Sequence, residues 1–473
     1  MKKHLWGSIF CGVLGFCVVI CAFVLLWGRY DRITLEEKTV FGDRTKAEGV
    51  SLQFDSMWEN RLFWTVSATV KQNGTDADTD FRFVGDGIDA AYYEEKPGPD
   101  LGNVQYGSGG ITPAELKKFI GDKLYGVLEE ISRDLPAGET KSYIVRLKDY
   151  YDYFPTNFLG VGDAVESVDR VDYFRIPVPS DYRHIFSISK DDNGKVISFD
   201  GQSSLSLQNY GFTDGDTVYA AFNLVQENRS AEQENVIESQ TYMSLPADMR
   251  GIHCIPLKKG EGTAEEKKTM PDFSRAKLGY GLAEDAVIIS LTESTDGGSL
   301  YLVTAEDRNT YLTVIDKSSM KEVQKIDLHF TEGKDYDLGS FYDNLFPVID
   351  CEKGLVVFFG DDFLCYEKGD DGKLSLWCKD RADGLESMYA YTENEAMDFD
   401  GTRLALGVRT FAETSITDDL GNTYSGIETT TSPGLLIYEK SGLVYAGIFQ
   451  SSVEKDNTID VQENKTPLRV KLP

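Results

Sequence analysis

Histidine and cysteine are scarce in this sequence. Four histidines and seven cysteines occur among its 473 residues. Outside the N-terminal segment, His184, His253 and His329 stand singly, and none belongs to an H-E-x-x-H motif or another closely spaced pair. Zinc hydrolases need ligands at such spacings, and disulfide scaffolds need a denser set of cysteines. The sequence therefore supports neither class.

Motifs for nucleophilic catalysis and for phosphate binding are missing too. The sequence contains no G-x-S-x-G nucleophile elbow and no G-x-x-x-x-G-K-[ST] phosphate loop. Carbohydrate chemistry by two carboxylates leaves almost no linear motif. An enzyme of that kind is thus the catalytic class that remains open.

Positive charge is in short supply. There are 48 lysines and arginines against 78 aspartates and glutamates, which gives a net charge of −30. Nucleic acids and anionic lipid surfaces are recognised through clustered lysine and arginine. We therefore expect no nucleic-acid partner, and we interpret the excess of acidic residues first as a source of solubility.

A long apolar run stands out against this acidic background. Residues 5–27 read LWGSIFCGVLGFCVVICAFVLLW and contain no charged side chain. A helix rises about 1.5 Å per residue, so this run covers the roughly 30 Å of a bilayer core. We expect a transmembrane helix at 5–27, preceded by a cytoplasmic tail at 1–4 and followed by a juxtamembrane linker at 28–49.

The flanking charges indicate which side of the membrane the rest of the chain occupies. Lys2 and Lys3 precede the run, and Arg29 and Arg32 follow it. The two flanks thus carry equal numbers of cationic side chains, and the free amino group on a short tail favours a cytoplasmic N-terminus. A cleaved signal peptide is the alternative, but no small-x-small site follows the apolar core. The prediction is a single-pass protein of the cell membrane, with 50–473 as an extracytoplasmic domain.

Beyond the run, short β-favouring segments alternate with turns rich in Gly, Asp and Asn. The clearest strands are GVSLQF, RLFWTVSATV, IFSISK, TVYAAFNLV, AVIISLT, YLTVIDK, LVVFF, RLALGV and GLLIYEK. One helical insertion is expected at 112–135, where Thr112 and Glu115 form a capping box around Pro113. An apolar stripe from Leu116 to Ile131 predicts that this helix packs against a core.

Three strands in the C-terminal half end in a similar way. Ile315-Asp316-Lys317, Tyr366-Glu367-Lys368 and Tyr438-Glu439-Lys440 are each followed by a polar turn and another strand. A further turn, Asp398-Phe399-Asp400-Gly401, precedes the strand RLALGV. Over about residues 280–450 this pattern resembles the blades of β-propeller proteins of the WD-type and related classes, without their Trp-Asp and Gly-His dipeptides. The resemblance implies a mainly β, propeller-like domain.

Two other organisations stay open. A β-sandwich shows a similar cadence of strands and turns, and an N-terminal α+β domain could end near residue 180, before a C-terminal β domain. In a propeller, the strand near residue 50 and the last strand, Leu468–Leu472, would pair and hide their edges. Residues 258–275 and 410–433 lack apolar periodicity, and we expect them to be exposed, mobile loops.

One candidate metal site is a row of aspartates. Asp76, Asp78 and Asp80 alternate like the start of a calcium loop. Phe81 and Gly87, however, stand where such a loop needs a glycine and a bidentate glutamate. Calcium is the one cofactor that the sequence suggests, and a solvated hairpin tip is the simpler interpretation.

The densest aromatic cluster is a candidate ligand site. Tyr150, Tyr151, Tyr153 and Phe154 surround Asp152. Rings that stack on sugar faces, beside carboxylates that accept hydroxyl protons, are typical of glycan clefts. The same alternation also fits an ordinary strand that leads into a proline turn.

Cys365 and Cys378 flank a predicted hairpin turn and could be near neighbours. A disulfide needs Cα atoms within about 7 Å, which the sequence leaves open. Buried free thiols are the simpler interpretation.

Three hypotheses on function follow. The first is a membrane-anchored, non-enzymatic protein that binds an envelope protein or a glycan. The alternative is a carbohydrate-active enzyme with paired carboxylates in an aromatic-lined pocket. The third is a sensory ectodomain, which would need a membrane partner because residues 1–4 leave no room for a signalling domain.

Overall fold

The protein is mainly β and divides into two compact units. Unit 1 comprises Met1–Tyr93 and Pro347–Pro473, and unit 2 comprises Glu94–Phe346. The predicted sub-boundary near residue 180 falls inside unit 2. The computed structural model describes residues 16–21, 35–58, 62–83, 100–102, 106–159, 165, 168–202, 205–229, 237–259, 269–306, 309–330, 347–385, 388–390, 396–417, 423–451 and 468–473.

The predicted membrane span at 5–27 lies outside the described residues, except for residues 16–21, which are helical. Within the described ranges, no helix is both long enough and apolar enough to cross a membrane. The span and the orientation of the chain stay predictions.

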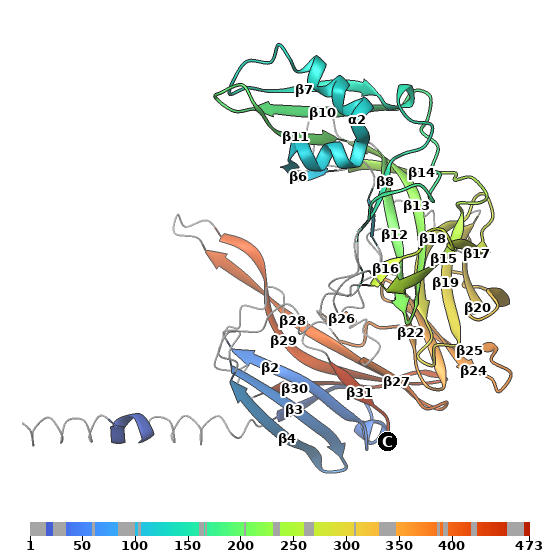
Figure 1. Cartoon of the computed structure of the whole chain (residues 1–473). Coiled ribbons are helices and arrows are strands. Elements are labelled where there is room, and N and C mark those ends of the chain that lie inside the picture. Colours follow the sequence, from blue (N-terminus) through green and yellow to red (C-terminus); the bar gives the residue numbers. More distant parts are fainter. Residues whose placement is uncertain are drawn as a thin grey trace, which may run out of the picture. The chain divides into compact units, whose positions relative to one another are not determined.

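The described residues of unit 1 form three antiparallel sheets (Figure 1). The first has the order β31 (Arg469–Lys471), β2 (Ser51–Trp58), β3 (Leu62–Lys71) and β4 (Gly74–Phe83). The second has the order β22 (Val348–Asp350), β23 (Gly354–Phe359), β24 (Asp362–Lys368) and β25 (Leu374–Arg381). The third has the order β1 (Leu35–Gly42), β30 (Gly442–Ser451), β29 (Thr423–Glu439), β28 (Leu404–Thr417) and β26 (Met388–Ala390), and β27 (Met397–Phe399) also pairs with β28.

Strands from opposite ends of the chain pair in the first sheet. Ser51, Leu52 and Gln53 lie opposite Lys471, Val470 and Arg469, respectively. This confirms the predicted pairing of the strand near residue 50 with the last strand. The pairing gives β2 a partner on its second edge, which would otherwise be open to another chain.

The recurring strand ending corresponds to one position in the sheets. The three predicted endings belong to β20 (Asn309–Asp316), β24 and β29. Strands β20 and β24 are each the third of four in an antiparallel meander, and β29 is the third strand counted from β27 in a sheet of six strands. The turn that follows leads in each case to the next strand of the same sheet. The predicted repeat is therefore confirmed as a four-stranded unit in two of the three places, and such a unit is the kind of sheet that forms a propeller blade.

The lysine of this ending makes an equivalent ion pair in two of the meanders. Lys368 pairs with Asp350 at 2.6 Å, and Asp350 is buried at the end of the first strand. Lys317 pairs with Glu293, which also ends a first strand. The repeat in the sequence thus has a structural reason, because the lysine neutralises a carboxylate on the neighbouring hairpin.

In unit 2, the part of the chain that the structure describes forms four sheets. One is the meander β18 (Val287–Glu293), β19 (Ser299–Glu306), β20 and β21 (Lys321–Asp327), and another runs β5 (Asp100–Gly102), β8 (Thr156–Leu159) and β9 (Val168–Val171). A third runs β12 (Leu205–Asp214), β13 (Thr217–Arg229), β15 (Gly251–Lys259) and β16 (Thr269–Pro271), with β14 (Ile237–Met243) on β13 and β17 (Lys277–Gly281) on β15. The fourth runs β6 (Tyr106–Ile111), β11 (Val196–Gln202), β10 (Arg183–Lys190) and β7 (Thr140–Arg146).

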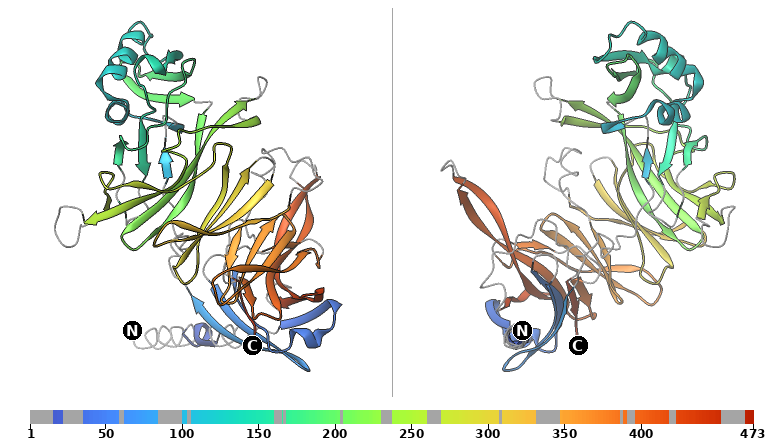
Figure 2. Two further views of the ribbon diagram at one scale, coloured as in Figure 1. Left: turned by 90° about the vertical axis from the view of Figure 1, so that its right-hand side faces the viewer. Right: turned by 60° about the vertical axis from the view of Figure 1, so that its left-hand side comes forward.

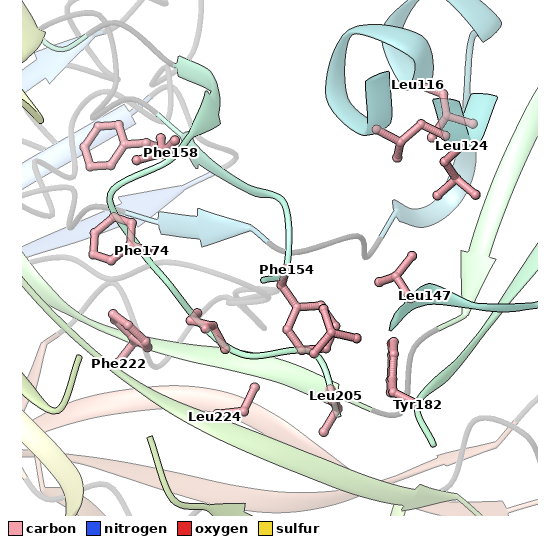
Figure 3. Packing of buried hydrophobic residues seen from close by; sticks show 14 of the residues in the cluster. Leu116, Leu124, Leu147, Phe154, Phe158, Phe174, Tyr182, Leu205, Phe222 and Leu224 are labelled. Carbon is pink, nitrogen blue, oxygen red and sulfur yellow. The ribbon is translucent and has the colours of Figure 1, made fainter. Parts of the chain in front are cut away.

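The predicted helix is present as α2 (Pro113–Ile131), beside the sheet of β7 and β10 (Figure 1). It breaks at Gly121, whose φ of 75° and ψ of 171° are outside the helical region. Ile131, at the end of the predicted stripe, is 37% exposed, but its members Leu116, Ile120, Leu124 and Leu128 are buried as predicted. They join the main core of unit 2, which also contains the aromatic rings in Figure 3.

Residues 35–47 are part of unit 1 and not a free linker. Strand β1 pairs with β30, and a 3-10 turn, η1 (Arg44–Ala47), follows it. Glu37 holds this segment in place, because its carboxylate accepts hydrogen bonds from Arg44 and from the Tyr445 hydroxyl. The prediction of a linker at 28–49 failed here because acidic residues in β1 hide a strand that lies at the edge of its sheet.

Residues 410–417 and 423–433 form an arm of two paired strands, where a loop was predicted. Strands β28 and β29 stay paired from Leu404 opposite Tyr438 as far as Thr417 opposite Thr423. The arm is visible in both views of Figure 2. Threonine and isoleucine favour strands, and this preference outweighs the missing alternation of apolar residues.

Candidate functional site

The sheet of β31, β2, β3 and β4 has one apolar and one polar face. Alternate residues of a strand point to opposite faces. The apolar face carries Leu52, Val66, Ala68 and Val470, which are buried in the core of unit 1. The polar face carries side chains that are exposed or half-buried, namely Ser51, Gln53, Ser67, Thr69, Arg469 and Lys471.

The register of the strands arranges these polar residues in rows. Ser51 lies between Lys471 on β31 and Thr69 on β3. Gln53 likewise lies between Arg469 and Ser67. Each row therefore places a cation at one side and hydroxyl or amide groups in the middle.

A groove of about 490 Å³ opens beside these rows. Strand β27 contributes Met397 and Asp398 to its wall. Asp398 accepts a hydrogen bond from the backbone N–H of Leu472 at 2.8 Å, which ties β27 to the end of β31. We call this cavity the β2–β31 groove. Its lining comprises Ser51, Leu52, Gln53, Ser67, Ala68, Thr69, Met397, Asp398, Arg469, Val470 and Lys471.

The lining residues suit a polar ligand with a negative charge. Arg469 and Lys471 supply positive charge, and hydroxyl and amide groups can both donate and accept hydrogen bonds. Asp398 is the single carboxylate in this lining, and no aromatic ring is among the lining residues. The groove therefore lacks the two carboxylates that hydrolysis of a glycosidic bond requires.

The predicted calcium ligands extend the same rows on β4. Asp76 lies opposite Thr69, and Asp78 lies opposite Ser67. Asp76, Asp78 and Asp80 are all exposed. Successive carboxylates on one face of a strand are about 7 Å apart, and among the described residues no group of three His, Cys, Asp or Glu could hold a metal ion. Calcium at these positions stays a prediction.

Asp400, in the turn after β27, caps this turn with its side chain. Its carboxylate accepts hydrogen bonds from the backbone N–H groups of Thr402 and Arg403 at 2.7 and 2.8 Å. Burial acts to raise the pKa of Asp400, but these hydrogen bonds outweigh burial and the pKa is lowered. Asp316 caps its turn in the same way, with Ser319.

The aromatic candidates are divided between core and surface. Tyr150 and Tyr151 are half-buried against the core of unit 2, and the Tyr151 hydroxyl donates to the carbonyl of Ile120. Phe154 is buried, with its ring 5.1 Å from that of Tyr182 (Figure 3). Tyr153 alone is exposed, and it makes an isolated bridge with Pro177.

This segment does not form the strand that its alternation suggested. A 3-10 turn, η3 (Leu147–Asp149), precedes it, and regular pairing starts only at Thr156. Phe154 therefore lies in the core of unit 2, Tyr150 and Tyr151 pack against this core, and Tyr153 is exposed. A ligand site at these four residues stays a prediction.

The two buried histidines are structural. The Tyr173 hydroxyl lies 2.9 Å from Nδ1 of His253, and the Met249 carbonyl lies 3.1 Å from its Nε2. His184 is fully buried on β10, and Nε2 of this ring has no hydrogen-bond partner in the described part of the chain. Burial lowers the pKa of His184 to about 4, so this ring is neutral near pH 7.

A second cavity in unit 2 is much smaller. It has a volume of about 30 Å³ and lies beside Arg250 and Glu284. Two nitrogens of Arg250 are buried there without a hydrogen-bond partner among the described residues. A space of this size holds about one or two water molecules, which would satisfy these donors.

Comparisons with known proteins do not assign the chain to a family. No family model matches it, and no curated protein matches its sequence. Solved structures give weak likenesses. The periplasmic gluconolactonase of Pseudomonas aeruginosa has a TM-score of 0.27 and 10% identity over 80% of this chain and 94% of that chain.

Two further structures are similar to the same degree. Hydrazine synthase of Kuenenia stuttgartiensis has a TM-score of 0.21 and 12% identity, over 50% of this chain and 72% of that chain. Hsv2 of Kluyveromyces lactis has a TM-score of 0.20 and 11% identity, over 61% of this chain and 93% of that chain. Likenesses of this strength support no conclusion about activity.

The residues that line the groove escaped prediction from sequence. Arg469 and Lys471 belong to the last strand, which was identified only as a partner for the strand near residue 50. Combining that pairing with the alternation of β2 would have placed both cations beside Ser51 and Gln53. The signal was present, but it needed the register between strands far apart in the chain.

Proposed function

We propose that this chain is a membrane-anchored binding protein of the cell envelope, whose β2–β31 groove takes a sugar acid. The observation that carries the proposal is the position of Arg469 and Lys471 beside four hydroxyl and amide side chains in one groove. A carboxylate that accepts hydrogen bonds from these cations would be held by charge-assisted bonds. The hydroxyl groups of a sugar would form hydrogen bonds with the hydroxyl and amide side chains on β2 and β3.

The overall charge narrows the class of ligand. A chain with a net charge of −30 repels long polyanions. A monomer or short oligomer with few negative charges meets the local cations without this repulsion. We therefore expect a small sugar acid rather than an anionic polymer.

The membrane anchor is part of the same proposal. Residues 5–27 would span the bilayer, with the N-terminus in the cytoplasm and the sheets of both units outside. Strand β1 starts at Leu35, so only a short segment separates the apolar run from the first strand of unit 1. At about 3.4 Å per residue, this segment keeps the start of β1 within roughly 25 Å of the bilayer. The repeated meanders support a propeller-like architecture for the exported part.

A titration tests the ligand class. We expect the full chain in detergent to bind glucuronate. Glucose and inorganic phosphate should bind at least about tenfold more weakly, because glucose lacks the negative charge and phosphate lacks the sugar hydroxyls. Lys471→Met should weaken glucuronate binding by about five- to tenfold. Lys379→Met, at an exposed site on β25, is the matched control and should change nothing. Equal binding of all three probes would contradict the proposal.

The enzymatic alternative is tested in the same sample. A carbohydrate-active enzyme would convert glucuronides or sugar lactones, and the product would appear in proton NMR spectra. Turnover by the wild type that disappears in Asp398→Asn would show that the groove is an active site and not only a binding site. Binding without turnover supports the proposal.

Fractionation of cells that express the full chain tests the anchor. The full chain should stay in the membrane fraction after a high-salt wash, and protease added outside should digest both units. Deletion of residues 2–27 should release the protein from the membrane fraction. A full chain that fractionates as a free protein would contradict the anchor without affecting the groove.

A further inference from the structure

Two cysteines face each other across a pair of neighbouring strands in unit 1. Cys365 on β24 and Cys378 on β25 are register partners in the antiparallel ladder. Partners in such a ladder have Cα atoms about 4.5–5.5 Å apart. A disulfide spans Cα separations of about 4.4–6.8 Å. The backbone therefore already holds these two residues at the right separation for a disulfide.

The two thiols also share one environment. Both side chains are buried in the same core cluster, together with Cys351. A hydrogen bond between the two thiols, followed by burial, raises the pKa of Cys365. A contact of this kind places the two sulfur atoms next to each other, with no other side chain between them.

We propose that Cys365 and Cys378 are a thiol–disulfide exchange site, and that they are joined when the chain meets a small disulfide oxidant such as oxidised glutathione. One cysteine, as the thiolate, attacks the oxidant and forms a mixed disulfide, and the first glutathione leaves as a thiol. The second cysteine then attacks the mixed disulfide and releases the second glutathione. Two protein thiols are oxidised, the oxidant is reduced, and both protons end on the released thiols.

The position of the pair in the sheet explains how an oxidant reaches it. Among the described strands, β25 is at the edge of its sheet, since it pairs only with β24 in the order β22-β23-β24-β25. Opening of an edge strand breaks one ladder and exposes Cys378 first. Burial and the raised pKa make exchange slow in the closed state, because the thiolate is the attacking species. We expect oxidation to proceed during folding or during local opening of β25.

Cys351 is the competing partner and therefore the useful control. It lies in the turn between β22 and β23, where its N–H donates to the Gly354 carbonyl at 2.9 Å. It is not a register partner of either cysteine. Burial raises the pKa of Cys351 to about 12. The pKa of Cys365 is raised as well, so the position of Cys351 outside the ladder of β24 and β25, and not its reactivity, separates it from the pair. Cys254 lies in unit 2 and provides a second buried thiol outside the pair.

Peptide mapping tests the proposal on the full chain. The protein is equilibrated with oxidised and reduced glutathione, both in the native state and during refolding from urea, and is then alkylated in denaturant and digested with trypsin. We expect the peptide Gly354–Lys368 to be linked to Leu374–Lys379, with Cys254 and Cys351 alkylated. Cys378→Ala should abolish the link, whereas Cys351→Ala and Cys254→Ala should retain it.

Two results would overturn the proposal. One is full alkylation of Cys365 and Cys378 after both native incubation and refolding. The other is a link from Cys365 to Cys351 in the wild-type chain. If β25 opens too slowly in the native state, the refolding experiment still decides the question, because the two thiols are accessible before the sheet forms. Neither result depends on ligand binding in the β2–β31 groove.

Discussion

Leu52 in β2 and Val470 in β31 are register partners, although one lies near the start of the chain and the other at its end. Both side chains are buried in the same core cluster of unit 1. This pairing holds the last strand on the sheet and places Arg469 and Lys471 at the groove. The candidate site therefore depends on the closure of the chain ends.

The contribution of the last strand is measurable at Leu468. This side chain is fully buried in the same cluster. We expect Leu468→Ala to lower the free energy of unfolding by about 2–5 kcal/mol, because it removes buried methyl groups and leaves a cavity. Lys471→Ala, three residues further on and on the opposite, exposed face of the sheet, should change it by less than about 0.5 kcal/mol. Urea unfolding followed by fluorescence compares them, and equal stabilities would contradict the closure.

The ion pair of Asp350 and Lys368 predicts a second, larger loss. Lys368→Met leaves the Asp350 carboxylate buried without its cation, and breaking a buried pair in this way costs about 3–5 kcal/mol. The double variant Asp350→Leu with Lys368→Met removes both charges and should recover most of that loss. A single variant as stable as the wild type in urea unfolding would show that the pair contributes nothing.

His184 predicts a loss of stability in acid. Burial lowers the pKa of this group to about 4 from an ordinary value of 6.5. Between these two pH values the unfolded chain binds a proton that the folded chain does not, so stability falls as the pH falls. His184 alone should lower the free energy of unfolding by about 3 kcal/mol as the pH falls from above 6.5 to about 4.

The variant His184→Leu isolates the part of the pH dependence that His184 causes. Its stability should fall less steeply between pH 6.5 and 4 than that of the wild type, in urea unfolding at several pH values. The control His329→Leu, at an exposed site, should keep the wild-type slope. Parallel slopes for all three proteins would contradict the assignment to His184.

Two glycines of α2 predict opposite effects of the same substitution. Gly121 has a φ of 75° and a ψ of 171°, a conformation that only glycine adopts readily. Gly121→Ala should therefore destabilise by about 1–3 kcal/mol. Gly126 is helical, and an added Cβ would meet nothing within 4 Å. Gly126→Ala should stabilise by about 0.5–1 kcal/mol. Thermal unfolding compares the two variants, and shifts in the same direction would contradict the kink.

Local patterns in the sequence predicted much of the fold. The endings Tyr366-Glu367-Lys368 and Tyr438-Glu439-Lys440 marked equivalent strands, because each third strand of a meander leads into a similar turn. The stripe around Leu124 predicted the buried face of α2. These features depend on neighbours in the chain, and periodicity and turn chemistry report on such neighbours.

Features that depend on distant partners were harder to predict. Glu37 lies in an acidic stretch that looks like a linker, and its role follows only from Arg44 and Tyr445. Phe154 alternates with its neighbours as in a strand, but packing against Tyr182 draws it into the core. The groove escaped prediction because it requires the register of β2 against β31, which no local pattern encodes.

The most direct test of the proposed groove is a crystal structure of the chain from Leu35 onward, with glucuronate at saturating concentration. The account predicts density for the sugar acid on the polar face of β2 and β31, with its carboxylate within hydrogen-bonding distance of Arg469 or Lys471 and its hydroxyls beside Ser51 and Thr69. An unoccupied groove at saturation, or glucuronate bound elsewhere on the protein, would contradict it.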